Sequence, residues 1–230
     1  MQLPTAVPIM TLPNVILFPQ AMLPLYIFEP RYRQMLTDVL ASHRMFAIAM
    51  QKQGRTRECP SGVAGLGLVR ASVANRDGTS NLVLQGLSRV RLERVVHYKP
   101  YRVYRIRPLA TPAPDTPTVD ALTTQVLDLV GERLKLGFQL PVHLVQQLAP
   151  HDDFKTQDSS AAISFKEVIK GLAKLNDPEQ LADLVSCTLL PVAEERQAIL
   201  EIVDLESRLK SLIQFLMGEI RRQQQHKAHE

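Results

Sequence analysis

The sequence predicts an α+β protein in which a mixed β-barrel is followed by an α-helical bundle with a long last helix. Before residue 110 the chain contains short apolar runs separated by Gly, Asn and Asp, a pattern typical of strands and turns. Residues 110–118 hold three prolines, which favour an extended linker. After the linker the hydrophobic period lengthens to about 3.6 residues, which indicates helices. We therefore expect two domains, residues 1–112 and 113–230.

The first domain begins with strand signals and one helix. Residues 7–12 form a short apolar run broken by Pro8, which an edge strand tolerates. Residues 30–40 predict a helix, because Pro30 suits a first turn and five apolar side chains recur at helical spacing. These side chains are Tyr32, Met35, Leu36, Val39 and Leu40. Residues 45–50 then form an apolar run of strand length.

Glycines mark two features of the following strands. Residues 62–73 predict a long strand, in which Gly65 and Gly67 indicate a bulge or a close approach of another backbone. Asp77-Gly78 supplies the positive φ that a tight hairpin turn needs, so the chain should reverse there.

Three more strand segments follow the hairpin turn. Residues 81–85 return from it, and residues 89–95 and 101–107 alternate charged with apolar side chains. We expect Ser88 to lie in a turn between the first two of these strands. Strands this frequent predict a mixed β-barrel or two packed sheets.

The second domain shows helical signals throughout. Apolar stripes predict helices over residues 119–136 and 162–175. Asp177 suits an N-cap with Pro178 at the first helical position, and a further helix should follow Pro191. The last helix should begin near Leu205. Residues 221–230 carry no apolar stripe, and we expect them to fray or to be disordered.

Composition excludes several classes of protein. The chain has 230 residues, of which 45% are hydrophobic, and no apolar run reaches the length of a membrane span. No basic segment precedes an apolar stretch at the N-terminus, so no secretory signal is visible. Cys59 and Cys187 are the only cysteines, which favours free thiols in a reducing cytoplasm.

Charge is unevenly distributed along the chain. Residues 1–118 carry a net charge of +9 and residues 119–230 a net charge of −5. The first domain therefore has a basic character that an acidic partner or a nucleic acid could use.

Motifs that carry catalytic chemistry are absent or incomplete. No glycine begins a phosphate-binding loop, and Gly86-Leu-Ser-Arg-Val90 lacks the second glycine of a nucleophile elbow. His151-Asp152-Asp153 has no second His or Cys nearby to complete a zinc site, which favours a solvated loop. Glu29, Arg31 and Arg33 could form a charged patch, although a structural ion-pair cluster explains them better. We expect no catalytic residue, no cofactor and no metal.

The residues resemble a known family at several points. Leu12-Pro-Asn-Val-Ile-Leu-Phe-Pro19 and Leu23-Pro-Leu-Tyr-Ile-Phe-Glu-Pro-Arg-Tyr-Arg33 look like the opening of the LON domain, the N-terminal substrate-recognition domain of the ATP-dependent Lon protease. Asn81-Leu-Val-Leu-Gln-Gly-Leu-Ser-Arg-Val90 resembles a later strand of that family. The resemblance extends over roughly residues 7–220, nearly the whole chain.

The resemblance implies a fold and a function. In that family the first half is a PUA-like β-barrel and the second a helical bundle. Lon proteases continue into an ATPase and a Ser–Lys protease module, for which 230 residues leave no room. We therefore expect a stand-alone, non-catalytic polypeptide-recognition module that acts as an adaptor in protein quality control. Its partners would be unfolded or extended polypeptide and a separate protease or ATPase. No membrane is involved, and a homodimer is open.

An apolar segment near the N-terminus is the expected peptide-binding site. Exposed apolar side chains on a barrel with edge strands would contact an extended chain. The alternative is that most of these side chains are core. The candidates are Val15, Ile16, Phe18, Met22, Leu23 and Tyr26.

Nucleic acid is the alternative ligand. PUA-like barrels include RNA-binding members, and arginines fall on two neighbouring strand segments. Odd spacings such as Arg102 and Arg105 put some of them on opposite faces, so a single basic stripe is not assured. The alternative is a solvated face with salt bridges. The candidates are Arg89, Arg91, Arg102 and Arg105.

Overall fold

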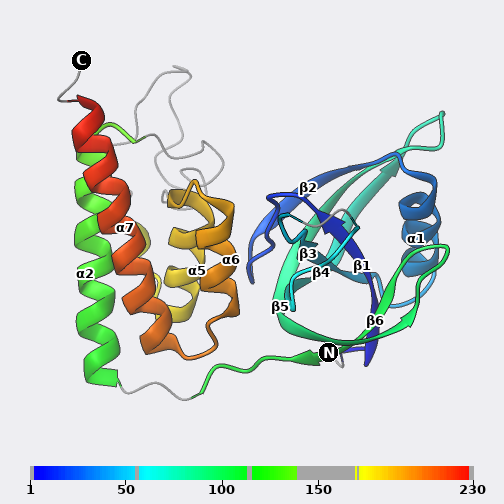
Figure 1. Cartoon of the computed structure of the whole chain (residues 1–230), viewed down its shortest axis with the longest axis horizontal. Helices are drawn as coiled ribbons and strands as arrows, with labels where there is room; N and C mark the ends of the chain where they lie inside the picture. Colours follow the sequence, from blue (N-terminus) through cyan, green and yellow to red (C-terminus); the bar gives the residue numbers. More distant parts are fainter. Residues whose placement is uncertain (1–2, 55–56, 113–115, 139–168, 170, 228–230) are drawn as a thin grey trace. The chain divides into compact units, whose positions relative to one another are not determined.

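Two compact units make up the chain. The computed structural model describes residues 3–54, 57–112, 116–138, 169 and 171–227 (Figure 1). The strand unit comprises Met1–Thr111 and Val192–Val203, and the helical unit comprises Pro112–Pro191 and Asp204–Glu230. This division differs from two consecutive domains, because Val192–Val203 groups with the strands.

Helix α6 (Ala193–Glu201) explains this grouping. The side-chain amide of Gln197 is buried and donates to the carbonyl oxygen of Val63 at 3.0 Å, while Arg196 donates to the carbonyl oxygen of Asn14 at 3.2 Å. The helix therefore packs on the strand unit, although it lies in the helical half of the sequence.

The strands of the first unit form a closed ring with one strand added outside it. The strands are β1 (Ala6–Leu12), β2 (Met22–Ile27), β3 (Met45–Met50), β4 (Val63–Ala74), β5 (Ser80–His97) and β6 (Val103–Pro108). β1 pairs in parallel with β3, and the pairs β3–β4, β4–β5, β5–β6 and β6–β1 are antiparallel. These pairings close the mixed barrel, and β2 pairs with β5 from outside the ring.

Strand β5 is continuous where the sequence predicts a turn. It runs for 18 residues, and Ser88 lies inside it, opposite Leu66 of β4. Residues 80–85 pair with β2 and residues 90–97 with β6. The prediction of a turn at Ser88 is therefore wrong. Gly86 suggested a turn, but this glycine instead allows the backbone of Phe18 to approach closely.

Three glycines of β4 and β5 leave room for close neighbours, which include the chain segment that precedes β2. A Cβ atom at Gly65 would overlap the carbonyl oxygen of Leu17, and one at Gly86 would overlap the carbonyl oxygen of Phe18. At Gly67 it would meet the side chain of Leu84. We call Gly65, Gly67 and Gly86 the glycine seat. The expected close approach of another backbone is confirmed at Gly65, whereas Gly67 has only side chains as near neighbours. The alternative expectation of a bulge fits the register shift between Leu66 and Gly67.

Pairing of β2 begins beside this seat. The amide of Gln20 donates to the carbonyl oxygen of Gly86 at 2.9 Å, and the amide of Gly86 donates to Ala21 at 2.8 Å. The seat thus fixes where β2 starts along β5, and with it the register of the pair.

Helix α1 (Pro30–Leu40) covers one face of the strands, as Figure 1 shows. Its predicted face is confirmed, because Tyr32, Met35, Leu36 and Val39 are buried. The hydroxyl of Tyr101 donates to Asp38 of this helix at 2.6 Å. Burial and this hydrogen bond raise the pKa of Tyr101 to about 12.

The helical unit contains α2 (Thr116–Lys135), α5 (Pro178–Leu189) and α7 (Leu205–Lys227). The Asp177 carboxylate caps α5 by accepting from the amide of Glu179 at 2.9 Å, which confirms the predicted N-cap. The apolar core is drawn from all three helices: Val119, Val126 and Val130; Leu181, Val185 and Leu189; Leu205, Leu209, Leu212, Leu216 and Ile220.

Ion pairs of two buried arginines fix these helices in register. Arg208 of α7 is fully buried and pairs with Glu179 at 3.0 Å and with Asp183 at 3.6 Å, both on α5. Arg133 of α2 pairs with Glu219 of α7 at 3.1 Å. A buried charge that loses its partner is costly, so these pairs disfavour any sliding of the helices.

One helical prediction is corrected by the structure, and another lies mostly outside the described residues. Helix α7 continues to Lys227, so the expected fraying from residue 221 is wrong for residues 221–227. The side chain of Gln223 donates to the carbonyl oxygen of Leu136 at 3.0 Å and Arg222 pairs with Glu219, which holds this last part without an apolar stripe. The helix predicted over residues 162–175 lies mostly outside the described residues.

The glycine seat predicts a strong effect of one methyl group. Gly86→Ala should lower the free energy of unfolding by about 3 kcal/mol, because the new Cβ meets a backbone oxygen that cannot rotate away. Gly62→Ala is the control, since a Cβ there meets nothing within 4 Å. Urea unfolding followed by circular dichroism measures both, and equal stability of the two variants would contradict the seat.

The buried ion pair predicts a second difference. Arg208→Ala should destabilise the helical unit by about 3 kcal/mol, because the buried Asp183 carboxylate loses its partner. Lys210→Ala on the same helix should change stability by less than about 0.5 kcal/mol, because the Lys210–Glu206 pair is exposed. Thermal unfolding followed by far-ultraviolet circular dichroism compares them. A negligible effect at Arg208 would show that the pair does not hold the helices.

Candidate functional site

The register of three strands gathers apolar side chains on one outer face. Residues directly opposite each other on paired strands share a face. Pro24 of β2 lies opposite Val83 of β5, which lies opposite Ala71 of β4. One step further, Tyr26 lies opposite Asn81, which lies opposite Val73. We call Met22, Pro24, Tyr26, Phe28, Ala71, Val73 and Val83 the apolar strip.

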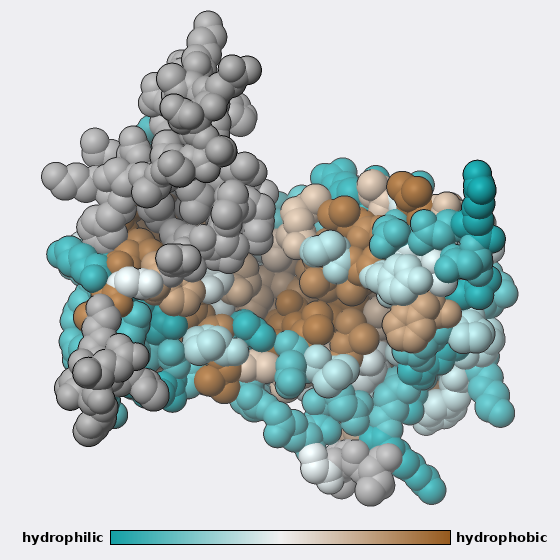
Figure 2. Space-filling view, turned by 90° about the horizontal axis from the view of Figure 1, so that it is seen from above, coloured by the Kyte–Doolittle hydropathy of each residue, from teal (hydrophilic) through white to brown (hydrophobic). Residues whose placement is uncertain are grey.

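Much of the strip is open to solvent. Tyr26 is 53% exposed, Phe28 59% and Val73 65%, and the rings of Tyr26 and Phe28 stack with centroids 5.9 Å apart. A hollow of about 420 Å³ lies over the strip, between Tyr26, Val73 and Val83. Figure 2 shows apolar side chains gathered on this unit and surrounded by hydrophilic ones. Side chains of this size usually pack away from water, so their exposure together marks a contact surface.

The lining of the hollow is nearly all apolar. It contains no charged side chain, and its polar residue is Asn81. A ligand here gains free energy by burying apolar area and not by pairing charge. The lining comprises Pro24, Leu25, Tyr26, Ala71, Val73, Asn81, Leu82 and Val83.

The outer edge of β2 does not favour another strand. β2 pairs with β5 alone among the described strands, so its other edge is unpaired. Pro24 sits in the middle of this strand and has no N–H to donate. The β2–β5 ladder accommodates Pro24, so the backbone nitrogen of Pro24 points away from β5 and toward the unpaired edge. There it leaves a gap in the row of N–H donors that a new strand would need. A ligand is therefore expected on the side chains of the strip and not along its edge.

The residues predicted to bind peptide separate into two groups. Met22 is 44% exposed and lies on the strip with Tyr26. Phe18 is fully buried, and Leu23 and Val15 pack against the core beneath α1. Ile16 is half-buried beside Leu17. Alternation along β2 explains the division, since Leu23 faces the side opposite to Met22.

Sequence reasoning missed the part of the strip that lies on β4 and β5. Val73, Ala71 and Val83 meet Tyr26 and Pro24 only through the register set by the turn at Asn75–Thr79. That turn was predicted at Asp77-Gly78, so counting back along both strands would have paired Val73 with Asn81. Phe28 gave no signal, because it follows the end of β2.

The predicted arginines do not form one surface. Arg89 is buried and its guanidinium lies 6.0 Å from the centroid of the Phe18 ring. Arg102 pairs with Glu58 at 3.6 Å. Arg91 and Arg105 are exposed, and Arg91 lies directly opposite Arg107 on the β5–β6 pair. Like charges placed opposite each other repel, although Arg107 also pairs with Glu93 at 3.2 Å.

The charged patch at the start of α1 is an ion-pair cluster. Arg31 donates to Glu58 at 2.6 Å and to Glu29 at 2.9 Å, while Arg33 points elsewhere. Burial of the Glu58 carboxyl opposes its ionisation, but the hydrogen bond and charge of Arg31 and the charge of Arg102 outweigh it, so the pKa of Glu58 lies below its ordinary value. A carboxylate so firmly ionised and paired is structural, as the sequence analysis favoured.

The described residues also bear on metal binding and on membrane crossing. In the part of the chain that the structure describes, no three His, Cys, Asp or Glu side chains are arranged to hold a metal ion. His151, Asp152 and Asp153 lie outside the described residues. Among the described helices, none has both the length and the apolar character that crossing a bilayer requires.

Two solved structures that resemble this chain are N-terminal domains of Lon proteins. The N-terminal domain of the Mycobacterium avium complex Lon protease superposes with a TM-score of 0.65 at 18% identity, covering 92% of this chain and 98% of that one. A Lon N-terminal domain protein from Xanthomonas campestris gives a TM-score of 0.57, also at 18% identity, over 92% and 99% of the two chains. The chain therefore has the fold of Lon N-terminal domains.

The chain belongs to the family described as the ATP-dependent protease La (LON) substrate-binding domain, whose model matches residues 6–217. This confirms the resemblance seen in the sequence. The Lon protease of Desulfosudis oleivorans is 24% identical over 216 residues, which cover 92% of this chain and 24% of that protein. Lon protease 2 of Myxococcus xanthus is 27% identical over 222 residues, with 93% and 24% covered. The chain spans about a quarter of the length of the curated relatives it matches.

Proposed function

We propose that this protein is a non-catalytic module that recognises unfolded or extended polypeptide through the apolar strip. The observation that carries the proposal is the group of exposed apolar side chains on β2, β4 and β5, with Tyr26 and Val73 each more than half exposed. Membership of a substrate-binding domain family supports the same conclusion.

The strip favours one kind of polypeptide. Stacked Tyr26 and Phe28 offer aromatic faces, and the hollow beside them is lined by aliphatic side chains. Segments with aromatic or large aliphatic residues would bury the most area there. Folded proteins keep such residues inside, so the strip would select chains that are unfolded or locally extended.

The cellular role follows from recognition without catalysis. We propose an adaptor in protein quality control that delivers polypeptide to a separate protease or ATPase, with a homodimer as one arrangement. Neither Cys59 nor Cys187, the only cysteines of the chain, forms a disulfide, which suits a reducing cytoplasm.

Substitution on the strip tests the proposal. The double variant Tyr26→Ser, Val73→Ser should bind a fluorescent, permanently unfolded polypeptide about tenfold more weakly than the parent, because two exposed contacts of the strip are lost. Fluorescence anisotropy measures the affinity.

A matched control lies on the same unit. Tyr98→Ser, Val96→Ser removes the same side-chain types, which are 64% and 56% exposed but lie outside the strip. This control should bind like the parent. Equal weakening in both double variants, or no binding by the parent at high micromolar concentration, would refute the strip as the site.

The Arg91–Arg107 pair favours nucleic acid as a second candidate ligand. Both side chains are exposed and lie opposite each other, although Arg107 also pairs with Glu93 at 3.2 Å. A phosphate backbone would relieve the repulsion between the two guanidinium groups.

Salt dependence tests this second candidate. Affinity for single-stranded RNA should fall as salt rises, and Arg91→Gln, Arg107→Gln should reduce the slope of log K against log salt by about 1.4, from two lost phosphate contacts. Arg76→Gln in the hairpin turn is the control. An affinity for RNA that changes neither with salt nor in the double variant Arg91→Gln, Arg107→Gln would exclude the β5–β6 face as an RNA site.

A further inference from the structure

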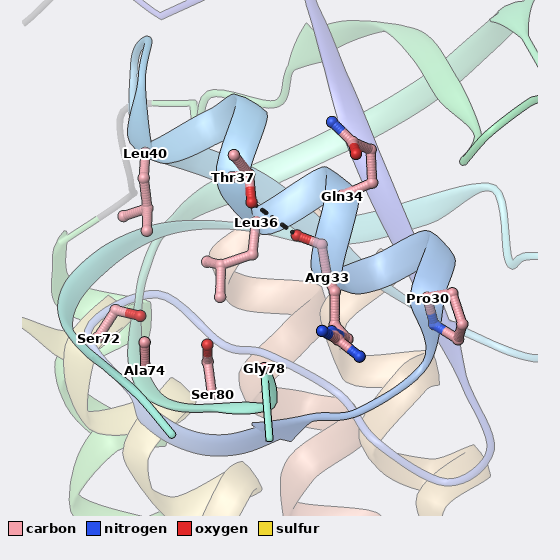
Figure 3. Close-up of a pocket in the computed structure, with 10 residues that line it drawn as sticks. All are labelled: Pro30, Arg33, Gln34, Leu36, Thr37, Leu40, Ser72, Ala74, Gly78 and Ser80. Atoms are coloured by element: carbon pink, nitrogen blue, oxygen red, sulfur yellow. Dashed lines mark hydrogen bonds between the residues drawn. The ribbon is translucent and has the colours of Figure 1, made fainter. Parts of the chain in front are cut away.

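A second, larger pocket lies between α1 and the β4–β5 hairpin. It has a volume of about 640 Å³, and Figure 3 shows its lining. Leu36, Leu40 and the head of Arg33 point from the helix toward the strands. Ser72 and Ser80 lie on the opposite wall, on the side of the sheet away from Val73. This pocket is therefore separate from the hollow over the apolar strip.

The guanidinium of Arg33, an exposed side chain, lies next to a glycine. A Cβ at Gly78 would overlap a terminal nitrogen of Arg33, so the guanidinium lies directly against the backbone of this residue. Gly78 also has a φ of +79°, which the hairpin turn requires. Thr37 donates to the backbone carbonyl oxygen of Arg33 at 3.1 Å, which is a contact within the helix.

The Arg33 guanidinium acts on the Asp77 carboxylate from a distance: hydrogen bonds from Thr79 lower the pKa of Asp77 most, and the charge of Arg33 lowers it further. Arg33 forms no ion pair within 4.0 Å among the described residues, unlike the neighbouring Arg31. The nearest acid along the hairpin is Asp77, whose carboxylate accepts from the amide and the hydroxyl of Thr79 at 3.0 and 2.6 Å. None of the described residues that line the pocket is acidic.

The remaining lining supplies hydroxyl donors and an apolar floor. The hydroxyls of Ser72 and Ser80 make no hydrogen bond to another described residue, so both are available to a ligand. Pro30, Leu36, Leu40 and Ala74 provide the apolar surface. One cation without an ion-pair partner within 4.0 Å among the described residues, beside hydroxyl donors, suits a single carboxylate, and the apolar floor suits a short aliphatic group attached to it.

We propose that this pocket binds the C-terminal residue of a polypeptide, with Arg33 pairing with the terminal carboxylate and Leu36 and Leu40 contacting an aliphatic side chain. The choice of a polypeptide end rests on the proposed function, since the strip on the other side of the same sheet would hold a more distant part of the chain. The pairing of carboxylate and guanidinium rests on the pocket alone.

Three small probes test the pocket independently of the strip. They are N-acetyl-leucine, N-acetyl-leucinamide and the α-amide of N-acetyl-glutamate, titrated into the full chain while its amide NMR signals are recorded. N-acetyl-leucine should shift the signals of Ser72, Gly78 and Ser80 and should bind about tenfold more tightly than its amide, because only the acid forms a charge-assisted pair. The glutamate probe, whose carboxylate is on the side chain, should bind more weakly than N-acetyl-leucine.

Variants assign the effect to Arg33. Arg33→Gln should remove the preference for acid over amide, Arg33→Lys should keep part of it, and Arg76→Gln, outside the pocket, should keep all of it. Equal binding of acid and amide by the parent, or an acid preference that survives Arg33→Gln, would overturn the proposal. Tighter binding of the glutamate probe would overturn the assignment to a chain terminus. None of these results depends on whether unfolded polypeptide binds the strip.

Discussion

The close approach of the Leu17–Phe18 backbone to the glycine seat is the constraint on which the strand unit depends. No side chain other than hydrogen fits at Gly65 or Gly86, because carbonyl oxygens occupy the space that a Cβ would take. The approach brings the chain to the outside of the barrel beside Gly86, where hydrogen bonds to Gln20 and Ala21 start the pairing of β2. Without this contact β2 would have no fixed start along β5.

The position of β2 in turn creates the candidate site. Strand β5 is long enough to pair with β2 over its first part and with β6 over its second, so the sheet extends beyond the closed ring. On this extension one face packs against α1 and the other is left to solvent. The exposed face carries the apolar strip, and the face toward α1 carries the Arg33 pocket. The apolar strip therefore depends on β2, whereas the Arg33 pocket is lined by α1, β4, β5 and the turn between the two strands.

Local signals in the sequence predicted the elements well and their assembly less well. Helix α1, the cap at Asp177 and the hairpin at Asp77-Gly78 were predictable, because each depends on residues a few positions apart. The role of Gly86 was not, since its partner, Phe18, is distant in sequence and a glycine alone does not distinguish a turn from a close approach. The strip residues on β4 and β5 were missed for a similar reason. Met22 and Tyr26 were named from β2, whereas Val73 becomes their neighbour only through pairing across three strands.

The grouping of α6 with the strands has a topological consequence. The chain passes between the two units three times, at residues 111–112, 191–192 and 203–204. A single cut in the proline-rich linker would therefore leave the units joined through two other covalent connections. A fragment that ended at residue 112 would lack helix α6 of its own unit. It would also lack the buried side-chain amide of Gln197, which donates to the carbonyl oxygen of Val63. Neither unit is a continuous segment of the polypeptide, so each can be completed only after most of the chain has been synthesised.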